Sequence, residues 1–287
     1  MRYLNEYLNS LSNQSCSDFD LVLLNDGVDA PALQDLLGSY NSLRVNVIDM
    51  PAGMGIPGIR KCGLDYAAGR YDCLVLTDCD DYFDRRRVEK TLYALQKYDF
   101  CYNNIIAVDE HGKRIGDAHF FDNTGNPVVA DRFTDILDRN FCGFSNTGIN
   151  LGRVDVSSLA IPGDVTAVDW WVFSLLVAGG CKGAYVEDTF TYYRQHGSNI
   201  VGAGGGLDIK KLRSGIEAKR MHYENLAKQL DQPYINMVKS RLDSINKFKY
   251  EMSSPEKMEE YINIMNGMDK NLLWWENIDY FKSMEET

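Results

Sequence analysis

The sequence lacks the features of a membrane-spanning, secreted or nucleic-acid-binding protein. It has no apolar stretch long enough to cross a bilayer and no secretory segment at its start. Basic residues are in deficit, with 30 Lys and Arg against 41 Asp and Glu and a formal net charge of −11. Because neutralisation of phosphates needs clustered cations, this balance excludes nucleic acid as a partner. The one basic cluster, Arg85-Arg86-Arg87, is interpreted as the solvated face of a helix, and the protein is expected to be cytoplasmic.

Paired cysteines are also lacking. The seven cysteines are an odd number, show no regular spacing and include no CxxC pair. This usage predicts free thiols in a reducing compartment rather than a disulfide framework or a zinc site. With 45% hydrophobic and 25% charged residues, the 287-residue chain can bury a sizeable core in one large or two ordinary domains.

Carboxylates are plentiful, and three of them crowd one point of the chain. Asp78, Asp80 and Asp81 directly follow the apolar run 73–77, which is typical of a buried strand. Two carboxylates about 4 to 5 Å apart repel by roughly 3 to 4 kcal/mol at an effective dielectric constant near 20, so the cluster favours a bound cation. Mg²⁺ or Mn²⁺ is the candidate, because such ions combine a few carboxylates with phosphate oxygens and water. The alternative is that these residues form only a turn and a helix cap.

Strand-like and helical patterns alternate through the first third of the chain, which predicts an α/β protein with a mostly parallel sheet flanked by helices. Ligands of such sheets bind beyond the carboxyl ends of the strands, where Asn25 and Asp26 lie as well as the acidic cluster. The expected strands are 21–24, 45–48 and 74–76, and the expected helices are 3–13, 32–39, 59–68 and 88–97.

The middle of the chain is less regular. We expect a hairpin formed by 100–108 and 117–121, an irregular loop at 142–148 and an apolar helix at 168–177. Two further strands are expected at 183–186 and 190–193.

The composition changes after the glycine-rich stretch 202–206, beyond which long amphipathic helical patterns prevail. A linker or flap is favoured there over a phosphate-binding loop, because no Gly-Lys-Ser/Thr sequence follows a strand. We therefore expect a domain over residues 1–206 and a helical region over 207–287. In the latter, Leu272-Leu273-Trp274-Trp275 is compatible with peripheral membrane contact, although docking of a terminal helix is favoured.

Five motifs resemble, in order and spacing, those of the family 2 inverting glycosyltransferases of GT-A fold. The resemblance covers about residues 1–202. The motifs are Asn25-Asp26-Gly27, the helix opening Gly55 to Gly63, Ala68-Gly69-Arg70-Tyr71 with Leu76 to Phe83, Val168-Asp169-Trp170-Trp171, and Tyr193-Arg194-Gln195-His196.

The resemblance implies a metal-dependent enzyme that moves a sugar from a nucleotide diphosphate donor to a glycan or lipid-linked acceptor in surface-glycan synthesis. Its cofactor would be Mn²⁺ or Mg²⁺. Asp169 would be the catalytic base, and its apolar neighbours are expected to raise its pKa; alternatively it only begins a helix. The other implied roles are contact with the nucleotide sugar by Asn25, Asp26, Arg60, Asp78 and Asp81, and metal binding by Asp80 and His196.

One departure concerns the first strand of the family, because residues 1–8 already have the pattern of the helix that follows it. Interior strands need hydrogen-bond partners along both edges. We therefore expect the gap between 21–24 and 74–76 to be filled, by this chain or by a partner in a homo-oligomer, or to be collapsed.

The same departure leaves a second function open, a sugar-nucleotide binding or scaffold protein that is catalytically weak. A nucleotidyltransferase is less favoured, because no Gly-rich loop bearing Lys or Arg follows the first strand.

Overall fold

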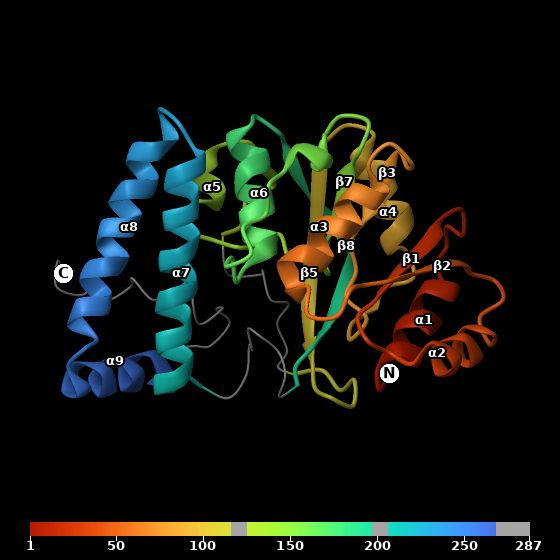
Figure 1. Cartoon of the computed structure of the whole chain (residues 1–287), viewed down its shortest axis with the longest axis horizontal. Coiled ribbons are helices and arrows are strands. Elements are labelled where there is room, and N and C mark those ends of the chain that lie inside the picture. The colour runs from red at the N-terminus through yellow and green to blue at the C-terminus, as the bar shows by residue number, and fades with distance from the viewer. Residues whose placement is uncertain (116–124, 197–205, 268–287) are drawn as a thin grey trace.

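The computed structural model describes residues 1–115, 125–196 and 206–267 (Figure 1). The amino-terminal elements are α1 (Leu4–Ser12), β1 (Asp20–Asn25), α2 (Ala30–Leu37), β2 (Arg44–Asp49), α3 (Gly55–Ala67), β3 (Cys73–Val75), β4 (Tyr82–Phe83) and α4 (Arg87–Leu95). The central elements are β5 (Phe100–Val108), β6 (Val129–Ala130), α5 (Phe133–Ile136), β7 (Thr147–Asn150), the 3-10 helix η1 (Val156–Ser158), α6 (Val168–Ala178) and β8 (Gly183–Arg194). The chain continues through α7 (Ile209–Gln229), α8 (Tyr234–Glu251) and α9 (Pro255–Gly267).

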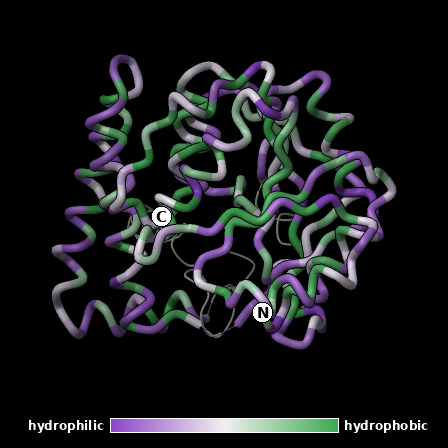
Figure 2. Tube along the Cα trace, turned by 45° about the vertical axis from the view of Figure 1, so that its right-hand side comes forward, coloured by the Kyte–Doolittle hydropathy of each residue, from purple (hydrophilic) through white to green (hydrophobic). Residues whose placement is uncertain are grey.

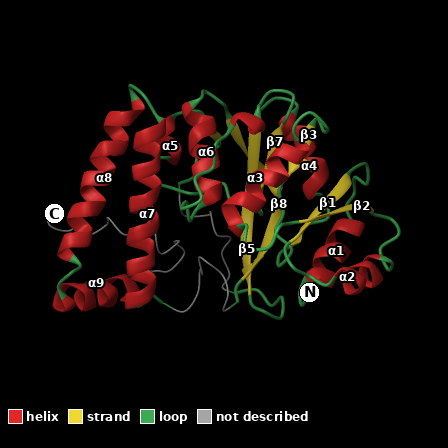
Figure 3. Cartoon of the chain, viewed as in Figure 1, coloured by secondary structure: helices red, strands yellow, loops and turns green. Residues whose placement is uncertain are grey.

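The strands form two sheets with helices packed around them (Figure 3). β1 and β2 make a parallel pair, and a six-stranded sheet has the order β3-β7-β5-β8-β4 with β6 also on β8. The predicted α/β class is confirmed, but the large sheet is mixed where a mostly parallel one was expected. Only β5 and β8 pair in parallel there, since β7 lies between β3 and β5 and runs opposite to both. Among the described residues no helix is long and apolar enough to cross a membrane.

The two strands predicted at 183–186 and 190–193 are one strand, β8. Its pairing with β5 shifts in register between Asn103 and Asn104, and Asp188 in the resulting bulge has a φ of 58°. A bulge adds residues without ending a strand, so the break in the sequence pattern marked an irregularity rather than a boundary. The expected hairpin partner 117–121 lies outside the described residues. Within them, Val108 at the end of β5 forms an antiparallel bridge with Arg114.

The helices α6 and α7 share one apolar core. Trp170 and Trp171 of α6 are fully buried, together with Tyr223 and Leu226 of α7. Figure 2 shows hydrophobic residues along segments in the middle of the molecule and many hydrophilic residues along the segments at its edges. The expected linker and the segment 272–275 lie outside the described residues apart from Gly206, so the division into two domains remains a prediction.

Within the described chain the gap in the sheet is neither filled by a strand nor collapsed, so those two forms of the prediction are wrong, whereas filling by a partner chain stays a prediction. β1 and β3 share no neighbouring strand, and a cavity of about 730 Å³ lies between them. The helices α3 and α1 line its two faces and hold the strands apart, and α3 comes so close that a Cβ on Gly63 would lie 2.9 Å from Leu24.

Candidate active site

The acidic cluster forms a turn directly after β3, in which the Asp81 amide donates to the Asp78 carbonyl at 3.2 Å. The Asp81 side chain is only 1% exposed and accepts hydrogen bonds from the Arg194 amide at 2.8 Å and from the Ser145 hydroxyl. Burial raises the pKa of Asp81 well above its usual range, and the charges of Asp80 and Asp78 raise it further. The structure therefore uses Asp81 to hold the turn, and leaves Asp78 and Asp80 facing outward.

Asp80 and His196 come together from opposite ends of the chain. The Asp80 Oδ2 and His196 Nε2 atoms are 2.9 Å apart, and the imidazole stacks on Tyr3 at a centroid distance of 5.2 Å. In the described part of the chain no group of three or more His, Cys, Asp or Glu side chains is placed to hold a metal. One carboxylate and one imidazole fit a divalent cation that completes its shell with phosphate oxygens and water.

Arg60 joins the acidic turn to the predicted base. Its guanidinium forms an ion pair with Asp78 and lies 4.9 Å from the centre of the Phe144 ring. Burial opposes the charge on Arg60, but Asp78 and, more weakly, Asp169 raise its pKa above the ordinary value. The cation is therefore retained in a half-buried position, paired with Asp78 and stabilised more weakly by the charge of Asp169.

Asp169 lies in the first turn of α6, where its Oδ1 atom accepts from the Trp170 amide at 2.8 Å. The two following indoles fix this end of the helix: Trp170 Nε1 donates to the Ile136 carbonyl and Trp171 Nε1 to the Ala160 carbonyl, each at 2.8 Å. Burial raises the pKa of Asp169, and the Trp170 amide opposes this rise. Both sequence interpretations of Asp169, as a base and as a helix-start residue, are thus compatible with its geometry.

The irregular loop expected at 142–148 passes directly beside Asp169. A Cβ on Gly143 would lie 3.7 Å from Asp169 Oδ2 and 3.2 Å from Asn146 Oδ1. Asn146 is 1% exposed and holds the loop by donating to the Asn103 and Phe141 carbonyls. A side chain at this position would therefore touch the acid at ordinary contact distance and press slightly on Asn146.

Asn25 and Asp26 do not join this group of residues. The Asn25 amide is used locally, since it donates to Asp49 at 2.8 Å and to the Val28 carbonyl at 2.9 Å while its oxygen accepts from the Val28 amide. Asp26, the next residue, is exposed. Within the described chain no hydrogen bond or ion pair links it to the other candidate site residues. The reason is the cavity between β1 and β3, which separates the two strand ends.

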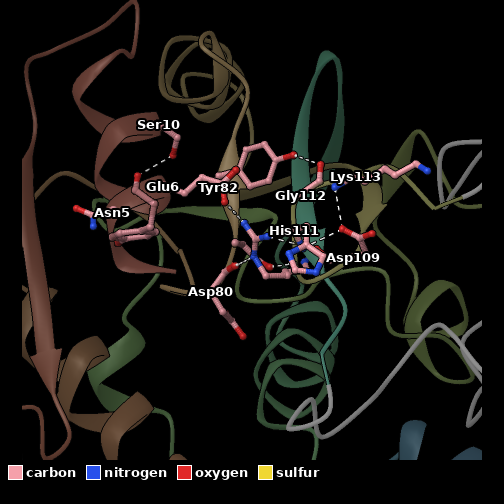
Figure 4. Close-up of polar contacts among 12 residues, drawn as sticks. Asn5, Glu6, Ser10, Asp80, Tyr82, Asp109, His111, Gly112 and Lys113 are labelled. Atoms are coloured by element: carbon pink, nitrogen blue, oxygen red, sulfur yellow. Dashed lines mark hydrogen bonds and ion pairs between the residues drawn. The ribbon is translucent and has the colours of Figure 1, made fainter. Parts of the chain in front are cut away.

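Arg194 is a buried residue at the site to which the sequence motif assigned no role. Its side chain is 1% exposed and donates to the Asp80 carbonyl at 2.8 Å, to the Asp109 carbonyl at 3.2 Å and to the Glu6 carboxylate. Figure 4 labels these three acceptor residues, Glu6, Asp80 and Asp109. Tyr3 lies under the same guanidinium at 4.6 Å. Arg194 thus fastens the acidic turn to α1 and to the turn after β5.

Arg87 corrects the interpretation of the basic cluster as a solvated face. It is 1% exposed, and it donates to the Leu76 carbonyl at 2.8 Å and to Asn103 Oδ1 at 3.2 Å. Burial lowers its pKa to about 10. Arg86 keeps the expected exposed position and pairs with Glu89. The pattern of three arginines did not indicate which one turns inward.

The α/β fold, with an acidic turn at the end of a strand and an acid at the start of a helix, defines a GT-A type protein. The chain belongs to glycosyl transferase family 2, whose model matches residues 2–155.

Similar solved structures cover nearly the whole chain. Staphylococcus aureus TarS residues 1–349 has a TM-score of 0.59 at 16% identity, over 91% of this chain and 74% of that one. The mannosyltransferase PcManGT from Pyrobaculum calidifontis has a TM-score of 0.57 at 10% identity, over 99% of this chain and 84% of that one. At these identities the likeness is one of fold.

Curated relatives match about a third of the chain. The uncharacterized glycosyltransferase YwdF of Bacillus subtilis is 28% identical over 107 residues, which is 37% of this chain and 38% of the relative. The amylovoran biosynthesis glycosyltransferase AmsB of Erwinia amylovora is 27% identical over 95 residues, 32% of this chain and 31% of the relative. The match therefore spans well under half the length of either relative.

Proposed function

We propose that this protein transfers a hexosyl-type sugar, with inversion, from a nucleotide diphosphate sugar to a hydroxyl group of a glycan or lipid-linked acceptor in surface-glycan synthesis. The observation that carries the proposal is the ion pair of the half-buried Arg60 with Asp78 at the acidic turn, together with the interaction of the same cation with the charge of Asp169. An anionic diphosphate and a reacting hydroxyl need a cation and a base in one place. Family membership supports an enzyme, and the name of AmsB supports a role in polysaccharide synthesis.

Asp169 would accept the proton of the attacking hydroxyl. In an inverting transfer the hydroxyl attacks the anomeric carbon from the face opposite the leaving diphosphate, so a carboxylate must lie on the acceptor side. The raised pKa of Asp169 makes it a better proton acceptor than an ordinary carboxylate. The buried indoles that anchor α6 would hold its carboxylate in position.

The leaving diphosphate would lie on the other side, near Arg60 and the acidic turn. Asp80 and His196 are the residues that would hold a divalent cation, which would stabilise negative charge on the diphosphate as a Lewis acid. PcManGT has been solved with GDP-Man and Mn²⁺, and TarS with UDP-GlcNAc, which supports a nucleotide sugar and a metal here. Asp78 would bind ribose or sugar hydroxyls once the ligand competes for Arg60.

A second candidate function is a catalytically weak sugar-nucleotide binding or scaffold protein. It is favoured by the separation of Asp26 from the rest of the site, which leaves the nucleoside side incomplete.

A panel of UDP-, GDP- and dTDP-sugars distinguishes the two functions. Thermal unfolding with and without Mn²⁺ reports binding, since a ligand of the folded state raises the midpoint. Release of the free nucleotide then reports turnover with water as acceptor. Metal-dependent binding with turnover supports the enzyme, binding without turnover supports the scaffold, and no binding by any donor contradicts both.

A further inference from the structure

His222 of α7 is a polar residue in the apolar core. It is 2% exposed, and neither of its ring nitrogens has a hydrogen-bond partner among the described residues. A neutral imidazole has one donor and one acceptor, and each buried group that is left unpaired costs free energy. Leucine or phenylalanine would fill the space without that cost. The stability of the core therefore does not account for a histidine at this position.

The imidazole of His222 lies flat against the indole of Trp170. The ring centroids are 3.5 Å apart and the ring planes differ by 5°, while the Trp171 indole meets the same imidazole edge-on at 6.5 Å. Burial lowers the pKa of His222 well below its usual range, and the charge of Lys219 lowers it further. The ring is therefore neutral, and it can stack on the indole without the cost of burying a charge. This stack restrains one face of Trp170.

The indole of Trp170 is restrained at its edge as well, because its Nε1 atom donates to the Ile136 carbonyl at 2.8 Å. The backbone amide of the same residue donates to Asp169 Oδ1, also at 2.8 Å. Because the indole and this amide belong to one residue, a shift of the ring moves the first turn of α6 and the contact with Asp169. The face and the edge of one indole thus determine where the Asp169 carboxylate lies.

The helix α7 lies beside α6 and holds two further segments around Asp169 (Figure 1). The Tyr223 hydroxyl donates to the Leu137 carbonyl at 3.2 Å, just after α5. The Asn225 side chain donates to Asp164 Oδ1 at 3.2 Å, in the loop that leads into α6. A site is held accurately when the residues behind it are themselves fixed by packing and hydrogen bonds. α7 supplies such a backing for the first turn of α6.

We propose that His222 is a positioning residue, which holds the Asp169 carboxylate in its productive orientation through the stack on Trp170. The inference rests on the proposed function, in which Asp169 accepts the proton of the attacking hydroxyl. His222 acts only through Trp170, and a displacement of a catalytic group by about 1 Å can lower a rate by about 10²-fold. It lies beyond residues 2–155, so the base is held by a helix outside the match to the family model.

Substitution of His222 by leucine tests the stack. Leucine is similar in size and removes both unpaired nitrogens, so the midpoint of thermal unfolding should fall by no more than about 2 °C. It offers no flat face to Trp170, so kcat for nucleotide release should fall at least about tenfold while donor affinity changes less than about threefold. His222→Phe restores a flat ring and should recover at least about a third of the native kcat.

Two further measurements separate positioning from a general loss of packing. The Trp170 amide should exchange hydrogen at least about tenfold faster in His222→Leu, because its contact with Asp169 loosens. This exchange needs no nucleotide sugar, so a native protein without turnover would count against the proposed function alone. The fall of kcat at acid pH should also move to lower pH in His222→Leu, because water that reaches Asp169 weakens the burial that raises its pKa.

Ile245→Ala is the matched control. Ile245 of α8 is fully buried in the same core, and its truncation leaves a cavity. The midpoint should therefore fall by at least about 4 °C, with kcat, its pH dependence and the exchange of the Trp170 amide near native.

Four results would overturn the proposal. His222→Leu could keep native kcat and native exchange at Trp170, or His222→Phe could lose as much kcat as His222→Leu. Ile245→Ala could lose as much kcat as His222→Leu, which would assign the loss to stability. A midpoint for His222→Leu below that of Ile245→Ala would show that the imidazole serves the stability of the core instead.

Discussion

Replacement of Asp169 by asparagine tests the assignment of the base with little disturbance of the fold. Asparagine has the same shape and keeps an oxygen that can accept from the Trp170 amide, a contact of 2.8 Å in the native protein. Loss of a charge from the first helical turn costs about 0.3 to 1 kcal/mol. The uncharged asparagine also avoids the cost of burying a charged carboxylate, the same cost that raises the Asp169 pKa, and this acts in the opposite direction. We expect the free energy of unfolding at neutral pH to change by no more than about 1 kcal/mol.

The effect on catalysis should be much larger. Loss of a positioned base lowers a rate by about 10²- to 10⁴-fold, which corresponds to about 3 to 5 kcal/mol in the barrier. Donor affinity should change less than about threefold, because Arg60 keeps its ion pair with Asp78. The loss should therefore appear in kcat rather than in donor binding.

The pH dependence gives an independent check. Because burial raises the pKa of Asp169, turnover of the native protein should fall as the pH drops through that raised value, and the residual rate of the Asn variant should lack this fall. The free energy of unfolding should depend on pH in the opposite direction. A raised pKa in the folded state means that stability is greatest below the unfolded value of 3.8 and is lost as the pH rises through the folded value. The Asn variant should not show this loss.

The assay is release of nucleotide from the donor identified in the panel, with Mn²⁺ present, beside donor affinity by calorimetry. Asp155→Asn is the matched control, since Asp155 also accepts a backbone N–H at a helix start, from Ser157 at 3.1 Å, but is exposed. Near-native turnover in Asp169→Asn, or an equal loss in Asp155→Asn, would refute the assignment. Asp164, which accepts from Asn225 at 3.2 Å, would then be the next candidate.

Three further predictions concern the metal, the acidic turn and the core. Asp80→Ala should abolish the Mn²⁺ dependence of UDP binding while leaving the fold intact, because it relieves repulsion; equal metal dependence in variant and native protein would rule Asp80 out as a ligand. Arg194→Lys cannot serve all three acceptors of the guanidinium, so urea unfolding should show a loss of about 2 to 4 kcal/mol and Mn²⁺ binding should weaken; unchanged Mn²⁺ affinity would separate Arg194 from the site. Gly183→Ala would overlap the Phe100 ring and should cost about 1 to 3 kcal/mol in the same assay, whereas Gly163→Ala meets no atom within 4 Å and should be nearly neutral; equal values would contradict the packing.

The order of helices and strands was predictable because it depends on local periodicity. The alternating patterns placed β1, β2 and β3 and the helices between them within a few residues of their observed positions. The acidic turn and Asp169 were also predictable, since a polar residue at the end of a buried strand or at the start of an apolar helix stands out against its neighbours. The roles of these residues as ligand and base remain predictions.

Other features depended on contacts that no local pattern records. Arg194 and Glu6 are 188 residues apart in sequence, and their ion pair exists only because β8 ends beside α1. Arg87 is buried with its guanidinium donating to the Leu76 carbonyl. The run of three arginines had predicted a solvated face for it.

The cavity beside β1 was the largest difference from expectation. The sequence by itself determined that a helix comes before the first strand of this chain, β1. Only the tertiary structure decided that α3 and α1 keep β1 and β3 apart instead of letting them pair. The physical reason is that strand pairing is set by how the flanking helices pack, and that packing sums contacts from segments far apart in the chain.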